Sequence, residues 1–143
     1  MLDKTFFCVI IYAYTNMIKK PYPIRSQAKL FKVLSDPTRL NIVMLLINGE
    51  LCVCQIEAVM CSHQAKISRH LAYLRKNGMV KVRCHWKWKY YSLEQPKTHF
   101  EKSLFKCLKK WLQNEKPFKK IYGRMKTCLA QPLVEVAKIT KKL

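Results

Sequence analysis

The stretch GELCVCQIEAVMCSHQAKISRHL, residues 49–71, places two cysteines one residue apart and, a dozen residues on, a segment dense in Lys, Arg and His. This basic segment predicts a helix from His63 to Asn77, with Ser62 as its N-cap. The apolar residues of the helix recur at i, i+4 and i+7 and form one stripe: Ile67, Leu71 and Leu74. Its remaining positions are mostly polar or basic, so we expect one buried face and an exposed remainder.

Three further helices are predicted on the N-terminal side of this basic helix. Apolar spacing indicates an amphipathic helix over 24–34. Asp36 and Pro37 predict the start of a second helix, because the carboxylate can cap free N–H groups and proline gives up a donor that the first turn never uses. The second helix is expected to end at Asn48-Gly49 and to bury one face: Leu40, Val43, Leu46 and Ile47. A short third helix is predicted within LCVCQIEAVM, residues 51–60.

The chain after Gly78 alternates apolar and basic residues on both sides of a short turn, as MVKVRCHWKWKYYSL. This pattern predicts a β-hairpin, one face of which must pack on the body of the domain. Trp88 and Tyr90 are therefore interpreted as core residues rather than as platforms for base stacking. A long final helix is predicted over 97–115. The segment after Pro117 is expected to be loose and basic, with one weak helix over 127–139.

The order of these elements is typical of a winged helix-turn-helix, with VMCSH as the turn. The expected fold class is α+β, mainly α, with a two-stranded β-hairpin wing. We expect an N-terminal extension over 1–23, a DNA-binding and dimerisation domain over 24–115 and a basic C-terminal tail over 116–143. The apolar run FFCVIIYAY is too short for a bilayer, which needs about 20 residues. Residues 1–16, before the start-like MIKKPYP, are expected either to lie outside the domain or to form an ordered arm.

The charge of the chain predicts a polyanionic partner. Lys and Arg number 28 against 8 Asp and Glu, which gives a net charge of +20. Such an excess raises association rates and counterion release with a nucleic acid or an anionic membrane surface. Of these two partners, nucleic acid is the one expected. The seven cysteines are an odd number in a chain without a convincing secretory signal. Reduced thiols and a cytoplasmic location are therefore expected.

In a helix-turn-helix the second helix enters the major groove, so its polar face must meet phosphates and base edges. The expected DNA contacts on this helix are seven residues: His63, Gln64, Lys66, Ser68, Arg69, His70 and Arg75. Gln64 and Arg69 suit bidentate base contacts, whereas the others include donors suited to phosphates. Arg83, Lys87 and Lys89 on the hairpin add a second contact surface. Taken alone, the basic face of the helix or of the hairpin could instead be an ordinary charged surface in contact with solvent.

Cys52 and Cys54 lie at the predicted start of the third helix. Unpaired N–H groups and the positive end of the helix dipole are expected to lower the pKa of both thiols there and to favour thiolates, which bind soft metal ions. The two thiolates can reach one ion if the helix start is not fully wound. Their spacing is poorly suited to an unstrained mutual disulfide.

The motifs LFKVLSDPTRLNIVMLL, ELCVC, KISRHLAYLRKNGMV and KWKYYSL, in this order and spacing, resemble the ArsR/SmtB family of metal-responsive repressors. The combination of ELCVC with KISRHL is similar to its arsenical-resistance branch, and the resemblance covers residues 24–112. It implies a homodimer that reads an inverted-repeat operator and is released when a thiophilic ion occupies Cys52 and Cys54. The paired histidines and acids of the family's zinc-type site are not evident on the last predicted helix.

The chain departs from the family pattern at two places. The arsenical branch often has a third cysteine where this chain has Glu57, and a carboxylate is a hard, poor ligand for arsenic. Cys61 lies about 10 Å along the helix from Cys54, too far to share an ion. The remaining candidates for a third donor are Cys8, Cys107 and Cys128, and none is assigned. The second departure is CHWK at the wing turn, where the family usually has Gly.

The function expected from the residues and the resemblance is an arsenite-responsive repressor that binds DNA without a cofactor and is not an enzyme. As(III) or Sb(III) would be the inducer. A sensor of Cd, Pb or Zn in the same family and a metal-independent winged-helix regulator remain alternatives. A thiol redox enzyme is disfavoured, because the chain lacks a CxxC motif on a βαβ pattern.

Overall fold

A computed structural model describes residues 24–112 and 114–141 of the chain. The chain divides into two compact units at residues 32 and 33, and residues 24–32 belong to the first. The helix α2, Arg25–Leu34, has its first turn closed by the Ala28 N–H, which donates to the Ile24 carbonyl at 2.9 Å. This confirms the helix predicted over 24–34. The predictions for residues 1–23 lie outside the described residues.

The second unit begins with α3, Pro37–Leu46, which is buried on every side along its C-terminal half. Asp36 caps it as predicted, since its Oδ1 accepts a hydrogen bond from the Arg39 N–H at 2.9 Å. The five consecutive residues 42–46 are all buried. A helix that is apolar all round belongs in the centre of a core rather than on its surface.

The strand β1, Leu51–Cys52, leads directly into α4, Val53–Met60, and α5 follows as Gln64–Lys76. Three residues join the two helices, and they form the turn of a helix-turn-helix. The N-cap of α5 is His63, so the prediction of Ser62 was wrong by one residue. The reason is that the Ser62 N–H still donates to the Glu57 carbonyl, at 3.2 Å, and so belongs to the end of α4.

The hairpin consists of β2, Val80–His85, and β3, Trp88–Leu93. His85 pairs with Trp88, which leaves a two-residue turn. β1 pairs with the other edge of β3, with Leu51 opposite Tyr91, so the sheet has the order β1-β3-β2. The prediction of a two-stranded wing missed β1, because two residues are too few to show a strand period.

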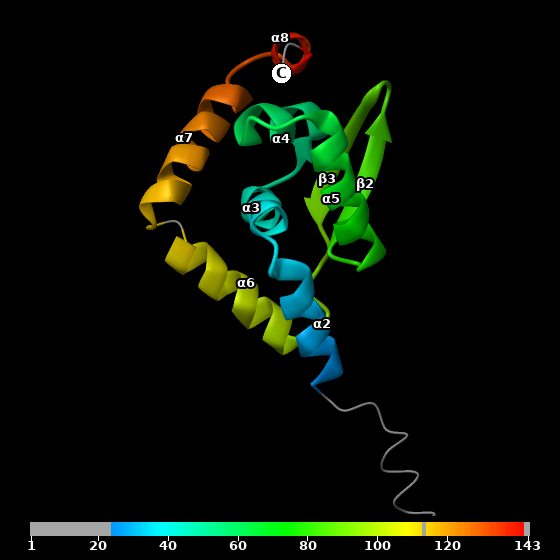
Figure 1. Ribbon diagram of the computed structural model, residues 1–143, viewed down its shortest axis with the longest axis vertical. Helices are drawn as coiled ribbons and strands as arrows, with labels where there is room; N and C mark the ends of the chain where they lie inside the picture. The colour runs from blue at the N-terminus through cyan, green and yellow to red at the C-terminus, as the bar shows by residue number, and fades with distance from the viewer. Residues whose placement is uncertain (1–23, 113, 142–143) are drawn as a thin grey trace, which may run out of the picture. The chain divides into compact units, whose positions relative to one another are not determined.

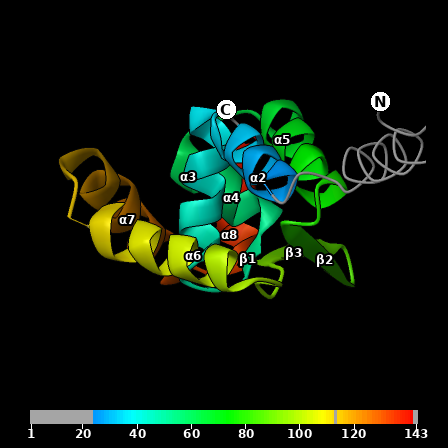
Figure 2. The ribbon, with the colours of Figure 1, turned by 90° about the horizontal axis from the view of Figure 1, so that it is seen from below.

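The buried stripe of α5 holds the second unit together. Ile67, Leu71 and Leu74 are all fully buried, as predicted, and α5 packs on α3 and β2. Figures 1 and 2 both show α5 and the hairpin on one side of α3 and α4, with α6 and α7 on the other. These elements form the predicted α+β, mainly α, winged helix-turn-helix. Homodimerisation stays a prediction.

Three helices complete the chain: α6, His99–Leu112, α7, Lys116–Leu129, and α8, Leu133–Thr140. The prediction of a loose segment after Pro117 was wrong, because Phe118, Met125 and Cys128 on α7 are buried. Their helical spacing was obscured by the lysines between them. α7 and α8 pack against α4, and Val136 of α8 is almost fully buried. No described helix has an apolar stretch long enough to cross a bilayer.

Candidate functional site

The polar face of α5 is open to solvent. Six of the seven DNA contacts predicted around this helix are exposed: His63, Gln64, Lys66, Ser68, Arg69 and Arg75. The Arg69 side chain folds back along the helix, with its Nε donating to the Ala65 carbonyl at 3.2 Å. Because the apolar stripe is seated in the core, these side chains project from a rigidly held helix.

His70 lies differently from the other six. It is half-buried, and its Nδ1 is 3.6 Å from Oδ1 of Asp36, the cap of α3. The hydrogen bond from the Arg39 N–H lowers the pKa of Asp36, and the charge of His70 lowers it further. The structure therefore turns His70 toward α3, and a DNA contact by this residue remains only a prediction.

The basic residues of the hairpin also differ in their partners. Arg83, Lys87 and Lys89 are all exposed. Arg83 is held by Glu50, with Nη2 to Oε2 at 2.7 Å and Nε to Oε1 at 3.3 Å, and its guanidinium lies over the Tyr90 ring. This bond lowers the pKa of the Glu50 carboxyl. Arg83 is therefore oriented by its contacts with Glu50 and Tyr90.

The tip of the hairpin carries an exposed aromatic residue. Trp86 is 91% exposed and has φ of 55°, in the region that favours glycine. Lys87 completes the turn with its Nζ 5.3 Å from the centre of the Trp88 ring. Trp88 and Tyr90 are half-buried, so neither lies fully in the core.

The two cysteines of ELCVC form a close pair at the start of α4. Cys52 is the last residue of β1 and the N-cap of α4, and Cys54 lies in the first turn. The Cys54 thiol donates to the Cys52 sulfur, with the two Sγ atoms 3.1 Å apart. This separation exceeds that of a disulfide bond, about 2.0 Å, and both cysteines are free thiols. The two sulfur atoms are therefore close enough to bind the same soft ion.

The two thiols of this pair differ in acidity. The hydrogen bond from Cys54, with help from the N–H groups at the start of α4, lowers the pKa of Cys52 to about 7. The same bond raises the pKa of Cys54, and burial adds to the rise. The expectation that both thiols have a lowered pKa is thus right for Cys52 and wrong for Cys54, because only one of them can be the acceptor.

Gln55 was not singled out from the sequence, yet it braces the pair. Its Oε1 accepts a hydrogen bond from the Cys52 N–H at 2.8 Å. Both partners are buried. The signal was available, because a glutamine three residues after an N-cap is the second half of a capping box. The bond holds the backbone of Cys52 at the junction of β1 and α4.

Glu57 occupies the position where the resembled branch often carries a cysteine. It is 5% exposed, and its Oε1 has no hydrogen-bond partner among the described residues. Burial raises the pKa of this carboxyl. An unpartnered buried acid costs free energy unless it is protonated.

The other described cysteines differ in exposure. Cys61, Cys84 and Cys107 are exposed, whereas Cys128 is buried on α7. The Arg124 Nη1 lies 2.8 Å from the sulfur of Cys61, at the far end of α4 from the pair. Cys8 lies outside the described residues. Within residues 24–112 and 114–141, no three His, Cys, Asp or Glu side chains are already arranged to hold a metal ion.

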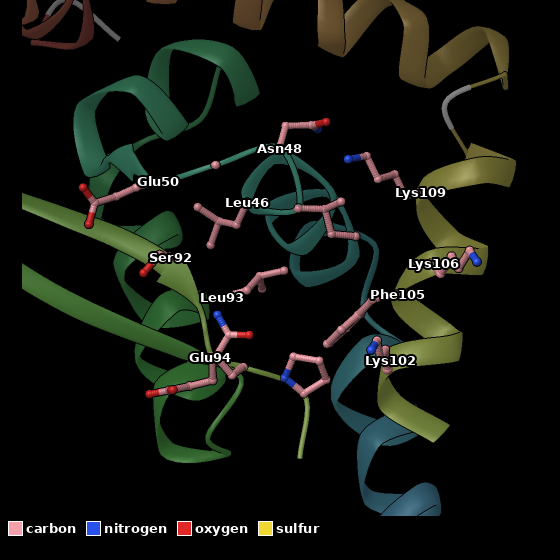
Figure 3. A pocket seen from close by; sticks show the side chains of 14 residues that line it. Leu46, Asn48, Glu50, Ser92, Leu93, Glu94, Lys102, Phe105, Lys106 and Lys109 are labelled. Carbon is pink, nitrogen blue, oxygen red and sulfur yellow. The ribbon is translucent and has the colours of Figure 1, made fainter. Parts of the chain in front are cut away.

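A separate groove runs between the end of α3, the end of β3 and α6, with a volume of about 510 Å³. Figure 3 shows Leu46, Leu93 and Phe105 facing it, with Lys102, Lys106 and Lys109 along α6. No cysteine lines this groove. It therefore offers nothing to a soft ion, and the thiol pair is the candidate site for one.

Comparison with known proteins identifies the helix-turn-helix. Residues 36–82 match the model of the family described as bacterial regulatory protein, arsR family. The chain is 52% identical over 66 residues to the arsenical resistance operon repressor of Escherichia coli (strain K12). It is 46% identical over 68 residues to the cadmium resistance transcriptional regulatory protein CadC homolog of Staphylococcus aureus. These matches span 46% and 47% of this chain but only 56% of the length of each relative.

A solved structure extends the likeness beyond the matched segment. The transcriptional repressor BigR from Xylella fastidiosa superposes with a TM-score of 0.54 at 30% sequence identity. The alignment covers 66% of this chain and 91% of that chain. With the family model and a relative matched over nearly its whole length, the chain belongs to the arsR family of bacterial regulatory proteins.

Proposed function

We propose that this protein is a transcriptional repressor that binds operator DNA as a homodimer and releases it when As(III) or Sb(III) binds Cys52 and Cys54. The DNA would be an inverted repeat read by two copies of α5, with the hairpin on the flanking backbone. Gln64 and Arg69 would contact bases, and Lys66, Ser68 and Arg75 phosphates. His63, His70, Arg83, Lys87 and Lys89 complete the proposed DNA surface.

The observation that carries this proposal is the position of the thiol pair relative to α5. The two sulfurs lie 3.1 Å apart at the start of α4, and only three residues separate the end of α4 from α5. Under this proposal, an ion held by both sulfurs would adjust the first turn of α4. Because α4 is short and rigidly joined to α5, that adjustment shifts the reading helix. A tenfold loss of operator affinity needs about 1.4 kcal/mol of coupling.

The chemistry of the pair favours a soft inducer. Cys52 has a pKa of about 7, so its thiolate is substantially populated near neutral pH. Thiolates prefer soft ions to hard ones. The Cys54 proton leaves when that sulfur binds, because a coordinated thiol is deprotonated. The hydrogen bond from the Cys52 N–H to Gln55 Oε1 belongs to the turn that ion binding would adjust.

The proposal is tested by operator binding of reduced protein, measured by fluorescence anisotropy with and without arsenite. Wild type should lose operator affinity as arsenite is added, whereas Cys54→Ser should bind DNA equally well in both conditions. Cys107→Ser is the matched control, because Cys107 is exposed on α6, remote in sequence from the pair. Retention of full operator affinity by arsenite-saturated wild type would overturn the proposal.

A sensor of Cd, Pb or Zn is the second candidate. It is supported by the likeness to the cadmium resistance regulatory protein homolog and by Glu57, whose carboxyl offers a harder ligand beside the thiols. Titration of each ion against the preformed operator complex separates the two. Release by Cd, Pb or Zn but not by arsenite would replace the first proposal.

A metal-independent regulator is distinguished by the cysteines themselves. If the pair were only a packed part of the core, Cys52→Ser would leave the response to every ion unchanged. The close S–S contact and the lowered pKa of Cys52 favour a ligand role over a purely structural one.

A further inference from the structure

The C-terminal helices, which lie beyond the matched family segment, place another thiol at the sensor helix. Cys128 is near the end of α7 and is 8% exposed. α7 packs against α4, the helix that begins at the thiol pair (Figure 1). Burial raises the pKa of Cys128, and the negative charge of the Cys52 thiolate raises it further. Cys128 and Ala58, which lies one helical turn after Cys54 on α4, line the same cavity.

α7 is seated on α4 by several independent contacts. Phe118 and Met125 are buried on α7, and Val136 of α8 is 1% exposed. Arg124 of α7 reaches the Cys61 sulfur at the end of α4. These contacts make α7 and α8 a packed cover over α4 and not a free tail.

A cavity provides access to this third thiol. It has a volume of about 490 Å³ and lies between α4, α7 and α8. Ala58 of α4, Cys128 of α7 and Val136 of α8 all line it. A small solute such as arsenous acid can therefore approach Cys128 without unfolding of the core, and an access path is one requirement of a ligand site.

We propose that Cys128 is the third sulfur donor of the inducer site, brought onto the Cys52–Cys54 pair by a movement of α7 against α4. This inference rests on the proposed function. The movement is required because no described set of three ligand side chains is already within coordinating distance. Binding of the ion would thus tie the C-terminal helices to the helix-turn-helix.

The bonding requirements of As(III) favour three sulfurs. Arsenous acid exchanges its three hydroxyl groups for three thiols, and each hydroxyl leaves as water with one thiol proton. Arsenic stays in the +3 state, so no oxidant or reductant is needed. Two thiols leave one As–O bond in place.

Other groups near the pair are less suitable as the third donor. Glu57 is buried on α4, but a carboxylate is a hard ligand for a soft ion. Cys61 lies at the opposite end of α4, about 10 Å from Cys54 by helical rise. Among the described cysteines outside the pair, Cys128 combines a soft donor, burial beside α4 and a cavity at its side.

The test is X-ray absorption at the arsenic edge on the full-length reduced protein loaded with arsenite, which counts the sulfur and oxygen neighbours of arsenic. Wild type should show three As–S bonds, and Cys128→Ala two As–S bonds with one As–O bond. Cys107→Ser, which removes an exposed thiol, should match wild type. Two As–S bonds in wild type, or three in Cys128→Ala, would overturn the proposal. A loss of sulfur neighbours in Glu57→Gln but not in Cys128→Ala would overturn it as well.

Binding of phenylarsine oxide separates this inference from the proposed function. Its arsenic carries a phenyl group and has bonds for only two thiols. Cys128→Ala should bind arsenite about tenfold more weakly than wild type but bind phenylarsine oxide equally well. This equal binding also shows that the variant is folded. If phenylarsine oxide bound wild type and Cys54→Ser alike, the proposed pair would fail and the third-donor inference with it.

Discussion

Helices α4 and α5 are separated by three residues, yet they are exposed to very different degrees. Five of the eight residues of α4 are buried, against three of the thirteen in α5. α4 is enclosed by α5, α7, α8 and the sheet, whereas α5 rests on one apolar stripe. The enclosed helix α4 carries the two thiols and Glu57, whose Oε1 has no hydrogen-bond partner in the part of the chain that the structure describes, and the open helix α5 exposes basic side chains. The proposed sensing and DNA-reading roles thus fall on adjacent helices that differ in burial.

This difference also explains how a signal could pass between the two. A buried helix cannot change its first turn without disturbing what packs on it, since protein interiors are close-packed. The exposed face of α5 can move without loss of packing as long as its stripe stays seated. Four sets of substitutions test this contrast between α4, which is packed on several sides, and α5, which is packed along one apolar stripe.

The largest expected effect is on the free energy of unfolding, and it comes from buried side chains of α4 and α5. Ile56→Ala in α4 and Leu71→Ala in α5 each remove a fully buried side chain, and each should lower the free energy of unfolding by about 2–5 kcal/mol. Arg75→Ala on the open face of α5 should change it by less than about 0.5 kcal/mol. Urea unfolding followed by circular dichroism measures all three. An Arg75→Ala cost as large as that of Leu71→Ala would show that α5 is held on more than its stripe.

The next effect concerns the open face of α5 as a DNA surface. Arg69→Ala should weaken specific operator binding by about 1–3 kcal/mol and relax the choice of base at one position. Lys66→Ala should weaken binding to all sequences and reduce the slope of log K against log salt by about 1. Binding titrations at several salt concentrations distinguish the two roles. Lys116→Ala, at the start of α7, is the control and should leave the salt slope unchanged.

A smaller effect is expected at the enclosed acid of α4. Burial in the folded protein raises the pKa of Glu57 above its ordinary value of 4.5. The contribution of Glu57 to the free energy of unfolding is therefore fully present below pH 4.5 and is lost as the pH rises through the folded pKa. Glu57→Gln should therefore be more stable than wild type at pH 7, by about 1 kcal/mol. The advantage should disappear below pH 4.5. Unfolding curves between pH 4 and 8 measure this, with the exposed Glu135→Gln as control, and an advantage independent of pH would contradict the burial argument.

The smallest effect is expected at the tip of the hairpin beside α5. Trp86 has a positive φ and is almost fully exposed, so glycine removes backbone strain with little loss of packing. Trp86→Gly should raise the free energy of unfolding by about 0.5–1 kcal/mol. Thermal unfolding measures the change. A lower melting temperature would mean that the indole packs in a way that its exposure does not indicate.

Much of the fold and part of the site could be predicted from the sequence. Asp36 before Pro37 gave the start of α3, and the stripe Ile67, Leu71 and Leu74 gave the buried face of α5. These are local signals, since a cap or a helical period acts within a few residues. β1 could not be predicted, because two residues become a strand only when β3 lies beside them. The Ser62 cap was wrong for a similar reason, since α4 retains the Ser62 N–H.

The order of the elements, the basic face of α5 and the position of two thiols at a helix start were determined by the sequence alone, because each depends on spacing along the chain. Only the tertiary structure decided which thiol keeps its proton and that Arg83 pairs with Glu50. It also decided that α7, which carries Cys128, packs against α4. Those outcomes depend on distances between atoms that are far apart in the chain. Packing sets such distances, and the order of residues does not reveal them by itself.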